Sequence, residues 1–255
     1  MNNLSEALRQ GLNTILEWIY PPKCMLCGSV MSVGQRIYLC PHCEGNLEII
    51  GEPACARCGA PLENEENFCL KCRMQDFPFV SNTALLLYDA FTKSIIYKFK
   101  YGDKPGCARS LAALAYRHLA GVFDGADVMV PVPLYPGKRR RRGYNQAELL
   151  ARELSKLCGA PVEPRALVRV RSTMPQARLN RAERENNVRG AFKANEKLKL
   201  KLILKGKKIL LIDDIYTTGS TLCACAEAMR EFDNVETRCF TLALAPADGG
   251  KYFES

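Results

Sequence analysis

Short apolar runs and amphipathic segments alternate along the chain from about residue 80 onward. The run 209–212 (ILLI) is uninterrupted, which is typical of a parallel strand buried on both faces. Further strands are predicted at 83–88, 127–133, 161–170 and 237–243. Helices are predicted at 91–100, 105–119, 146–157 and 222–231. This alternation predicts an α/β domain over residues 80–255.

Two other segments have a regular pattern. Leucines and isoleucines fall on one helical face near the start, which predicts an amphipathic helix over 1–22 that ends at two prolines. Its polar face is poor in lysine and arginine, so we expect it to pack on the protein rather than on a membrane. In 198–205 leucine alternates with lysine, which predicts an amphipathic strand, with a hairpin closed at Gly206 as one form of it.

Chemistry is concentrated where the strand 209–212 ends. Asp213 and Asp214 follow directly, at the strand end where ligands bind in open α/β sheets. A hydroxyl-rich loop and a helix come next, which together predict an anion site at a helix N-terminus. The loop residues are Thr217, Thr218, Gly219, Ser220 and Thr221. A capped turn would explain this loop but not the paired acids, so the pattern favours a sugar-phosphate site.

Eight of the thirteen cysteines form four C-x2-C pairs. The first set is Cys24, Cys27, Cys40 and Cys43, and the second is Cys55, Cys58, Cys69 and Cys72. Four thiolates in two knuckles predict a closed, structural zinc site, so 23–76 is predicted to be a double zinc ribbon. Redox dithiols, a single shared zinc and interleaved pairing are the alternatives. The other five cysteines lack ligand spacing and are expected to be packing residues: Cys107, Cys158, Cys223, Cys225 and Cys239.

The chain has 255 residues, of which 47% are hydrophobic and 25% charged, enough for one sizeable α/β domain and a small satellite. No apolar stretch is long enough to span a membrane, and the first residues do not form a signal peptide. We therefore expect a cytoplasmic location, with peripheral contact at the inner face of the membrane as an alternative.

The formal net charge is +9. Eight zinc-bound thiolates would contribute −8 and two zinc ions +4, which gives +5. Basic residues are concentrated in 138–142 and in the arginine-rich stretch 165–189. The run 138–142 is predicted to lie in a loop after the strand 127–133. Such clusters predict a polyanionic partner, either a pyrophosphate or the backbone of DNA.

The segment 208–221 resembles the phosphoribosyl pyrophosphate (PRPP) signature of the type I phosphoribosyltransferases. Further segments resemble the ComF family of competence-associated proteins: 98–102, 130–134, 142–151, 176–179 and 184–192, with the cysteine-rich front end. The resemblance covers nearly the whole chain. It implies the type I phosphoribosyltransferase fold, a central, mostly parallel sheet flanked by helices, with a small N-terminal double zinc ribbon.

The resemblance also implies roles for individual residues. Asp213 and Asp214 would hold the ribose hydroxyls, the loop 217–221 would bind the 5′-phosphate, and magnesium would accompany PRPP. The stretch 171–190 would cover the site. The pyrophosphate loop and its basic residues would be Pro133, Leu134, Lys138, Arg142, Arg184 and Lys100.

Three functions fit these features. The first is a competence protein for DNA uptake that binds PRPP, single-stranded DNA and competence-machinery proteins. The second is a metabolic phosphoribosyltransferase with a small acceptor, and the third is a non-catalytic PRPP-sensing adaptor. No general base or acceptor pocket is evident, because His42 lies in a knuckle and His118 in a predicted helix. Whether the protein transfers a phosphoribosyl group therefore stays open.

Overall fold

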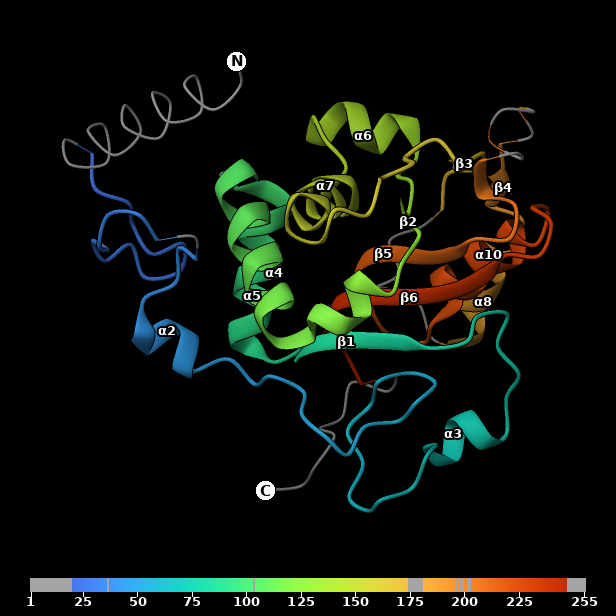
Figure 1. The fold of residues 1–255 in the computed structure, drawn as a ribbon, viewed down its shortest axis with the longest axis horizontal. Helices are drawn as coiled ribbons and strands as arrows, with labels where there is room; N and C mark the ends of the chain where they lie inside the picture. Colours follow the sequence, from blue (N-terminus) through green and yellow to red (C-terminus); the bar gives the residue numbers. More distant parts are fainter. Residues whose placement is uncertain are drawn as a thin grey trace.

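A computed structural model describes residues 20–35, 37–102, 104–173, 181–195, 197, 200 and 203–246. Its centre is a four-stranded parallel sheet in the order β1-β6-β5-β2 (Figure 1). The strands are β1 (Asn82–Leu87), β2 (Val128–Pro131), β5 (Lys208–Tyr216) and β6 (Glu236–Leu244). A second, two-stranded antiparallel sheet joins β3 (Leu167–Arg169) to β4 (Phe192–Ala194). The predicted parallel α/β fold is confirmed.

The apolar run in β5 is buried because each face of the sheet has its own core. Leu210 and Ile212 pack with α4 (Ala90–Tyr101), α5 (Lys104–Asp124) and α7 (Gln146–Cys158). Ile209 and Leu211 belong to the core that includes α10 (Ser220–Met229) and the small sheet. The helix α8 (Arg181–Val188) contacts α10 on this second face. Side chains alternate along a strand, so one continuous apolar run supplies both cores.

Two predicted elements are wrong. The basic run was expected in a loop, but it forms the helix α6 (Pro136–Arg142). Pro136 suits the first helical turn, and Gly143 ends the helix with a left-handed φ of 84°. In the predicted strand 198–205, the described residues Leu200, Ile203 and Leu204 are helical instead. Leu200 and Leu204 are both buried, as expected for positions four apart on one helix face.

Smaller differences concern boundaries. The segment 161–170 pairs as a strand only over β3, while Val162 makes an isolated bridge to Met129 of β2. The helix α5 runs to Asp124, past Leu119, which has non-helical backbone angles. The predicted N-terminal helix 1–22 lies almost wholly outside the described residues. No helix in the described ranges is long and apolar enough to cross a membrane.

The cysteine-rich part contains two short helices, α2 (Pro41–Gly45) and α3 (Leu70–Arg73), and wraps along the β1 side of the sheet (Figure 1). Between the two ribbons, the Ile50 N–H donates to the Leu85 carbonyl at 2.9 Å, and the Leu87 N–H to the Glu48 carbonyl at 2.9 Å. These bonds occupy part of the edge of β1, which would otherwise expose unpaired backbone groups.

Each ribbon docks on a different part of the α/β domain. In the first ribbon, the Leu26 carbonyl accepts a hydrogen bond from Lys98 Nζ of α4 at 2.8 Å. In the second, the Cys58 carbonyl accepts one from Asn82 Nδ2 of β1 at 2.9 Å. Gly59, with φ of 77°, lies so close to β1 that a Cβ would be 2.8 Å from the Asn82 carbonyl oxygen. The second ribbon is therefore fitted to the start of β1.

Candidate functional site

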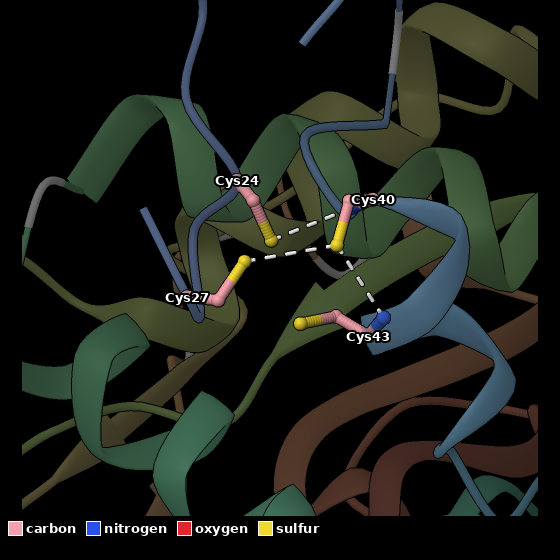
Figure 2. A group of neighbouring side chains, drawn as sticks. All are labelled: Cys24, Cys27, Cys40 and Cys43. Atoms are coloured by element: carbon pink, nitrogen blue, oxygen red, sulfur yellow. Dashed lines mark hydrogen bonds between the residues drawn. The ribbon is translucent and has the colours of Figure 1, made fainter. Parts of the chain in front are cut away.

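The eight paired cysteines form two separate groups, with no interleaving. Within each group the four Sγ atoms lie within 4.8 Å of one another, and in Figure 2 those of Cys24, Cys27, Cys40 and Cys43 face a common centre. The second group is Cys55, Cys58, Cys69 and Cys72. All thirteen cysteines are free thiols. The paired cysteines therefore form no disulfide bonds in this structure.

The spacing of the sulfurs fits zinc. Four thiolates about 2.3 Å from a tetrahedral zinc ion lie about 3.8 Å from one another. The Sγ atoms of Cys27 and Cys40 are 3.7 Å apart, and those of Cys58 and Cys69 are 3.8 Å apart. Both groups also receive an equivalent main-chain bond, from the Cys40 N–H to Cys24 Sγ at 3.4 Å and from the Cys69 N–H to Cys55 Sγ at 3.3 Å. The two sites therefore suit structural zinc.

The two acids lie within β5 rather than after it. The strand continues to Tyr216, because Asp213, Ile215 and Tyr216 still pair with β6. Neighbouring side chains of a strand point to opposite faces. Asp214 is accordingly bound from α4 and α7, whereas Asp213 lies near Arg169 and Cys225 on the other face. The expectation that both acids follow the strand end is corrected.

Asp214 is the centre of a buried polar cluster. Its Oδ2 accepts a hydrogen bond from Gln146 Nε2 at 2.9 Å and lies 2.8 Å from Lys100 Nζ. Arg142 in turn donates to the Gln146 side-chain oxygen. Gln146 is held in place because Asn145 caps α7, accepting from the Ala147 N–H at 3.2 Å. The cluster thus places two predicted cations, Lys100 and Arg142, beside a predicted acid.

Asp213, on the other face of β5, has a raised pKa. Burial raises its pKa to about 7, and the negative charge of Asp214 contributes to the increase. The Asp214 N–H donates to Asp213 Oδ1 at 2.9 Å, which partly offsets the loss of solvation. A carboxyl group with this pKa exchanges its proton near neutral pH.

Four cations gather near the acids. Partial burial lowers the pKa of Lys138, although its side chain still reaches solvent. Three further positive charges lower that pKa by repulsion: Arg142, Lys100 and Arg169. A cluster of positive charges that lowers the pKa of a neighbouring lysine is a favourable place for an anion.

Arg169 belongs to the predicted arginine-rich stretch 165–189 but is not among the individual site residues predicted from the sequence. Burial lowers its pKa, its guanidinium lies 5.1 Å from the centre of the Phe192 ring, and its Nε is buried without a hydrogen-bond partner among the described residues. A buried, unpaired donor on a cation is costly. Its position next to Asp213 therefore suits a ligand that supplies the missing acceptor.

The loop 217–221 leads directly into α10. Gly219 is the N-cap, with φ of 83° and no side chain to cap the helix. The hydroxyls of Thr218 and Ser220 are 2.6 Å apart, and both residues are buried. A Cβ on Gly219 would lie 2.5 Å from the Tyr216 hydroxyl. Glycine is therefore required here by both conformation and space. No side chain of the N-cap residue occupies the positive N-terminal end of α10, where an anion could bind.

The second zinc ribbon reaches this loop. Lys71 lies in α3 between two zinc ligands, Cys69 and Cys72, and its Nζ donates to the Thr218 carbonyl at 3.3 Å. No sequence pattern predicts this contact, since nothing in the knuckle distinguishes the half-buried Lys71 from a lysine that faces solvent.

The other predicted site residues are placed as follows. Pro133 and Leu134 are half-buried after β2, where the Val132 N–H donates to the Ile212 carbonyl at 2.9 Å, so this turn begins beside the acids. The side chain of Arg184 and residues 174–180 of the predicted covering loop lie outside the described part of the chain. A hollow of about 460 Å³ between the first ribbon and α5 includes none of the predicted site residues in its lining.

A parallel sheet with acids in β5, a hydroxyl-rich loop at the start of α10 and cations around them defines a phosphoribosyltransferase-type protein with an added pair of zinc sites. The comparison with protein families agrees. The chain belongs to the phosphoribosyl transferase domain family, whose model matches residues 99–252, more than half of its length. A second family model, the double zinc ribbon domain, matches residues 15–73.

The chain is also similar to several named proteins. It is 29% identical to Competence protein F of Haemophilus influenzae over 226 residues, which cover 82% of this chain and 97% of that protein. It is 27% identical to Competence protein ComFC of Streptococcus pneumoniae over 234 residues (86% and 99%). It is 26% identical to DNA utilization protein YhgH of Escherichia coli K12 over 215 residues (82% and 91%). The resemblance to the ComF family is confirmed.

Proposed function

We propose that this protein is a ComF-type competence protein that binds PRPP with magnesium and single-stranded DNA during DNA uptake in the cytoplasm. The polar cluster around Asp214 carries the PRPP part of the proposal. It brings an acid and two cations together beside β5, the strand that also leads to the phosphate-sized loop. The names of the relatives support the DNA part.

PRPP has three chemically different parts, and the site offers a matching surface for each. The loop 217–221 would receive the 5′-phosphate through main-chain N–H groups at the start of α10. Asp213 and Asp214 would accept hydrogen bonds from the ribose hydroxyls. The cations Lys100, Lys138, Arg142 and Arg169 would face the pyrophosphate. Bound magnesium would supply further positive charge against the pyrophosphate oxygens.

Ligand binding would rearrange the cluster. Lys100 Nζ lies 2.8 Å from Asp214 Oδ2. A pyrophosphate would compete for Lys100 and leave Asp214 to the ribose, so the ion pair would keep both groups in position until PRPP arrives. This exchange would also explain why Lys100 lies so close to Asp214, the acid that would bind the ribose.

The DNA part of the proposal places the strand on α6. Lys138, Arg139, Arg140 and Arg141 have exposed side chains on this seven-residue helix. Only Arg139 has a described ion pair, to Glu148 at 3.2 Å. Phosphate contacts from such residues give affinity that falls with salt.

Calorimetry with PRPP and magnesium tests the first part. We expect binding by the wild-type protein and its loss in Asp213→Asn/Asp214→Asn. Binding that is absent in the wild type, or unchanged in this variant, would reject the PRPP site. Charge reversal of Arg140 and Arg141 tests the second part, and unchanged affinity for single-stranded DNA at moderate salt would reject α6 as the DNA surface.

Enzymatic transfer is a second candidate, as either a metabolic phosphoribosyltransferase or a DNA-modifying one. Neither histidine belongs to the polar cluster, since His42 lies in α2 and His118 in α5. Asp213, whose pKa is raised to about 7, is a candidate base, so a transferase and a PRPP-binding or sensing protein both fit the site. A screen of nucleobases and DNA for PRPP-dependent release of pyrophosphate decides between them.

A further inference from the structure

Two tyrosines lie exposed on α4, next to the polar cluster. The side chains of Tyr97 and Tyr101 are 65% and 60% exposed, although α4 buries Ile95, Ile96 and Phe99 on its other side. They are four residues apart, and their ring centres are 5.0 Å apart with a tilt of 48°. Two large aromatic rings thus form one surface feature that does not contribute to the core.

Tyr101 is also connected to the polar cluster. The Arg142 guanidinium lies 5.2 Å from the centre of the Tyr101 ring, and its NH2 is 3.5 Å from the Tyr101 hydroxyl. The same arginine donates to Gln146, which donates to Asp214. The aromatic pair therefore lies at the border between the polar cluster and the basic helix α6.

The combination of exposed rings and exposed cations indicates the chemistry of a partner. A phosphate backbone would be attracted to α6, and its bases would need a flat, apolar surface within a short distance. A purely anionic partner would not need the tyrosines. A purely apolar partner would not need the four consecutive arginines 139–142.

We propose that Tyr97 and Tyr101 form a stacking platform for the bases of a single-stranded nucleic acid whose phosphates lie along α6. This inference rests on the proposed DNA binding and specifies where on the protein the bases would bind. Stacking is tolerant of sequence, because every base has a flat face. Because Arg142 contacts both Tyr101 and the polar cluster, bases on the platform would lie beside the proposed PRPP site.

Fluorescence anisotropy with a labelled oligo(dT) tests the platform in the full-length, zinc-loaded protein. We expect Tyr97→Ala and Tyr101→Ala each to weaken binding by about 5- to 160-fold, the range that corresponds to loss of one stacked base. The conservative variants Tyr97→Phe and Tyr101→Phe keep the ring and should bind like the wild type. Tyr20→Ala, which removes another exposed tyrosine, is the control and should also bind like the wild type.

The salt dependence separates stacking from charge. The alanine variants of the tyrosines should keep the wild-type slope of log Kd against log salt, whereas Arg140→Ala should reduce that slope by about one. In a second measurement, an oligonucleotide with 5-bromouracil should cross-link to Tyr97 or Tyr101 on irradiation, as located by mass spectrometry. Circular dichroism and thermal unfolding check that each variant is folded.

The outcomes distinguish this inference from the proposed function. Wild-type affinity in both tyrosine-to-alanine variants, with loss in Arg140→Ala, would overturn the platform and leave the DNA function intact. A wild-type protein that fails to bind DNA would reject the DNA function and the platform together. Weaker binding in the phenylalanine variants would also overturn the platform, because it would assign the effect to the hydroxyls.

Discussion

Lys71 in the second zinc ribbon donates a hydrogen bond from Nζ to the main-chain carbonyl of Thr218, at 3.3 Å. The contact joins two segments 147 positions apart, the short helix α3 between two zinc ligands and the candidate phosphate loop. The zinc ribbon is therefore in contact with the proposed ligand site, and this contact can be tested.

Lys71→Ala should weaken PRPP binding. The side chain both fixes the Thr218 carbonyl and brings a positive charge close to the expected position of the 5′-phosphate. Loss of one such hydrogen bond corresponds to about 1 kcal/mol, or roughly a fivefold increase in Kd by calorimetry. Arg73→Ala is the matched control, because Arg73 lies in the same short helix but pairs with Glu66. Equal effects of the two variants would contradict a specific role for Lys71.

Gly219→Ala should disturb the loop more strongly than a glycine substitution elsewhere. Gly219 has φ of 83°, and a Cβ would lie 2.5 Å from the Tyr216 hydroxyl and 2.8 Å from its ring. Gly159→Ala is the comparison, since Gly159 has φ of 79° but nothing within 4 Å of a Cβ.

Backbone strain alone costs about 1 kcal/mol, so Gly159→Ala should lower the free energy of unfolding by about that amount. Gly219→Ala should lower it by about 2 kcal/mol or more and should abolish PRPP binding, because Tyr216 must move. Denaturant unfolding and calorimetry measure the two effects. Similar results for both variants would show that the contact with Tyr216 is unimportant.

The pH dependence of stability should report Asp213. Its folded-state pKa is about 7, raised first by burial and then by Asp214, against an ordinary value of 3.8. The folded state therefore binds the proton more tightly than the unfolded state does. The stabilisation is complete at low pH and is lost as pH rises toward 7.

Asp213→Asn removes this titration. We expect the variant to gain about 1–3 kcal/mol relative to the wild type between pH 5 and 8, measured by denaturant unfolding at a series of pH values. Asp127→Asn, at an exposed carboxylate that accepts from the Lys208 N–H, is the control and should keep the wild-type slope over this range. Parallel stability curves for wild type and Asp213→Asn would contradict a raised pKa.

Features encoded by neighbouring residues could be predicted from the sequence. The strand 209–212, the loop 217–221 that leads into a helix and the cysteine knuckles all depend on local order, and the structure forms each of them. The contacts of Gln146 with Asp214 and of Lys71 with Thr218 join residues 68 and 147 positions apart. No local pattern marks such pairs, because a lysine in a knuckle and a glutamine in the first turn of a helix are both common.

The errors of prediction also have physical causes. The alternation of leucine and lysine in 198–205 fits a strand, but the same sequence places Leu200 and Leu204 four apart, which fits a helix equally well. The basic run 138–142 is predicted in a loop because it follows a strand that ends at prolines, yet arginine and lysine are good helix formers. Pro136 and Gly143 mark the two ends of that helix, and these signals were present in the sequence.

Loss of the second zinc site should act on PRPP binding through Lys71. Cys55→Ser/Cys58→Ser removes two ligands of that site, and Cys24→Ser/Cys27→Ser does the same for the first, so metal analysis should give about one zinc per chain in each variant, against two in the wild type. Only the second site holds the helix that carries Lys71. Adding Lys71→Ala should therefore have no further effect on PRPP affinity in Cys55→Ser/Cys58→Ser, but should keep its roughly fivefold effect in Cys24→Ser/Cys27→Ser. If Lys71→Ala weakens binding equally in both backgrounds, the second zinc does not position Lys71.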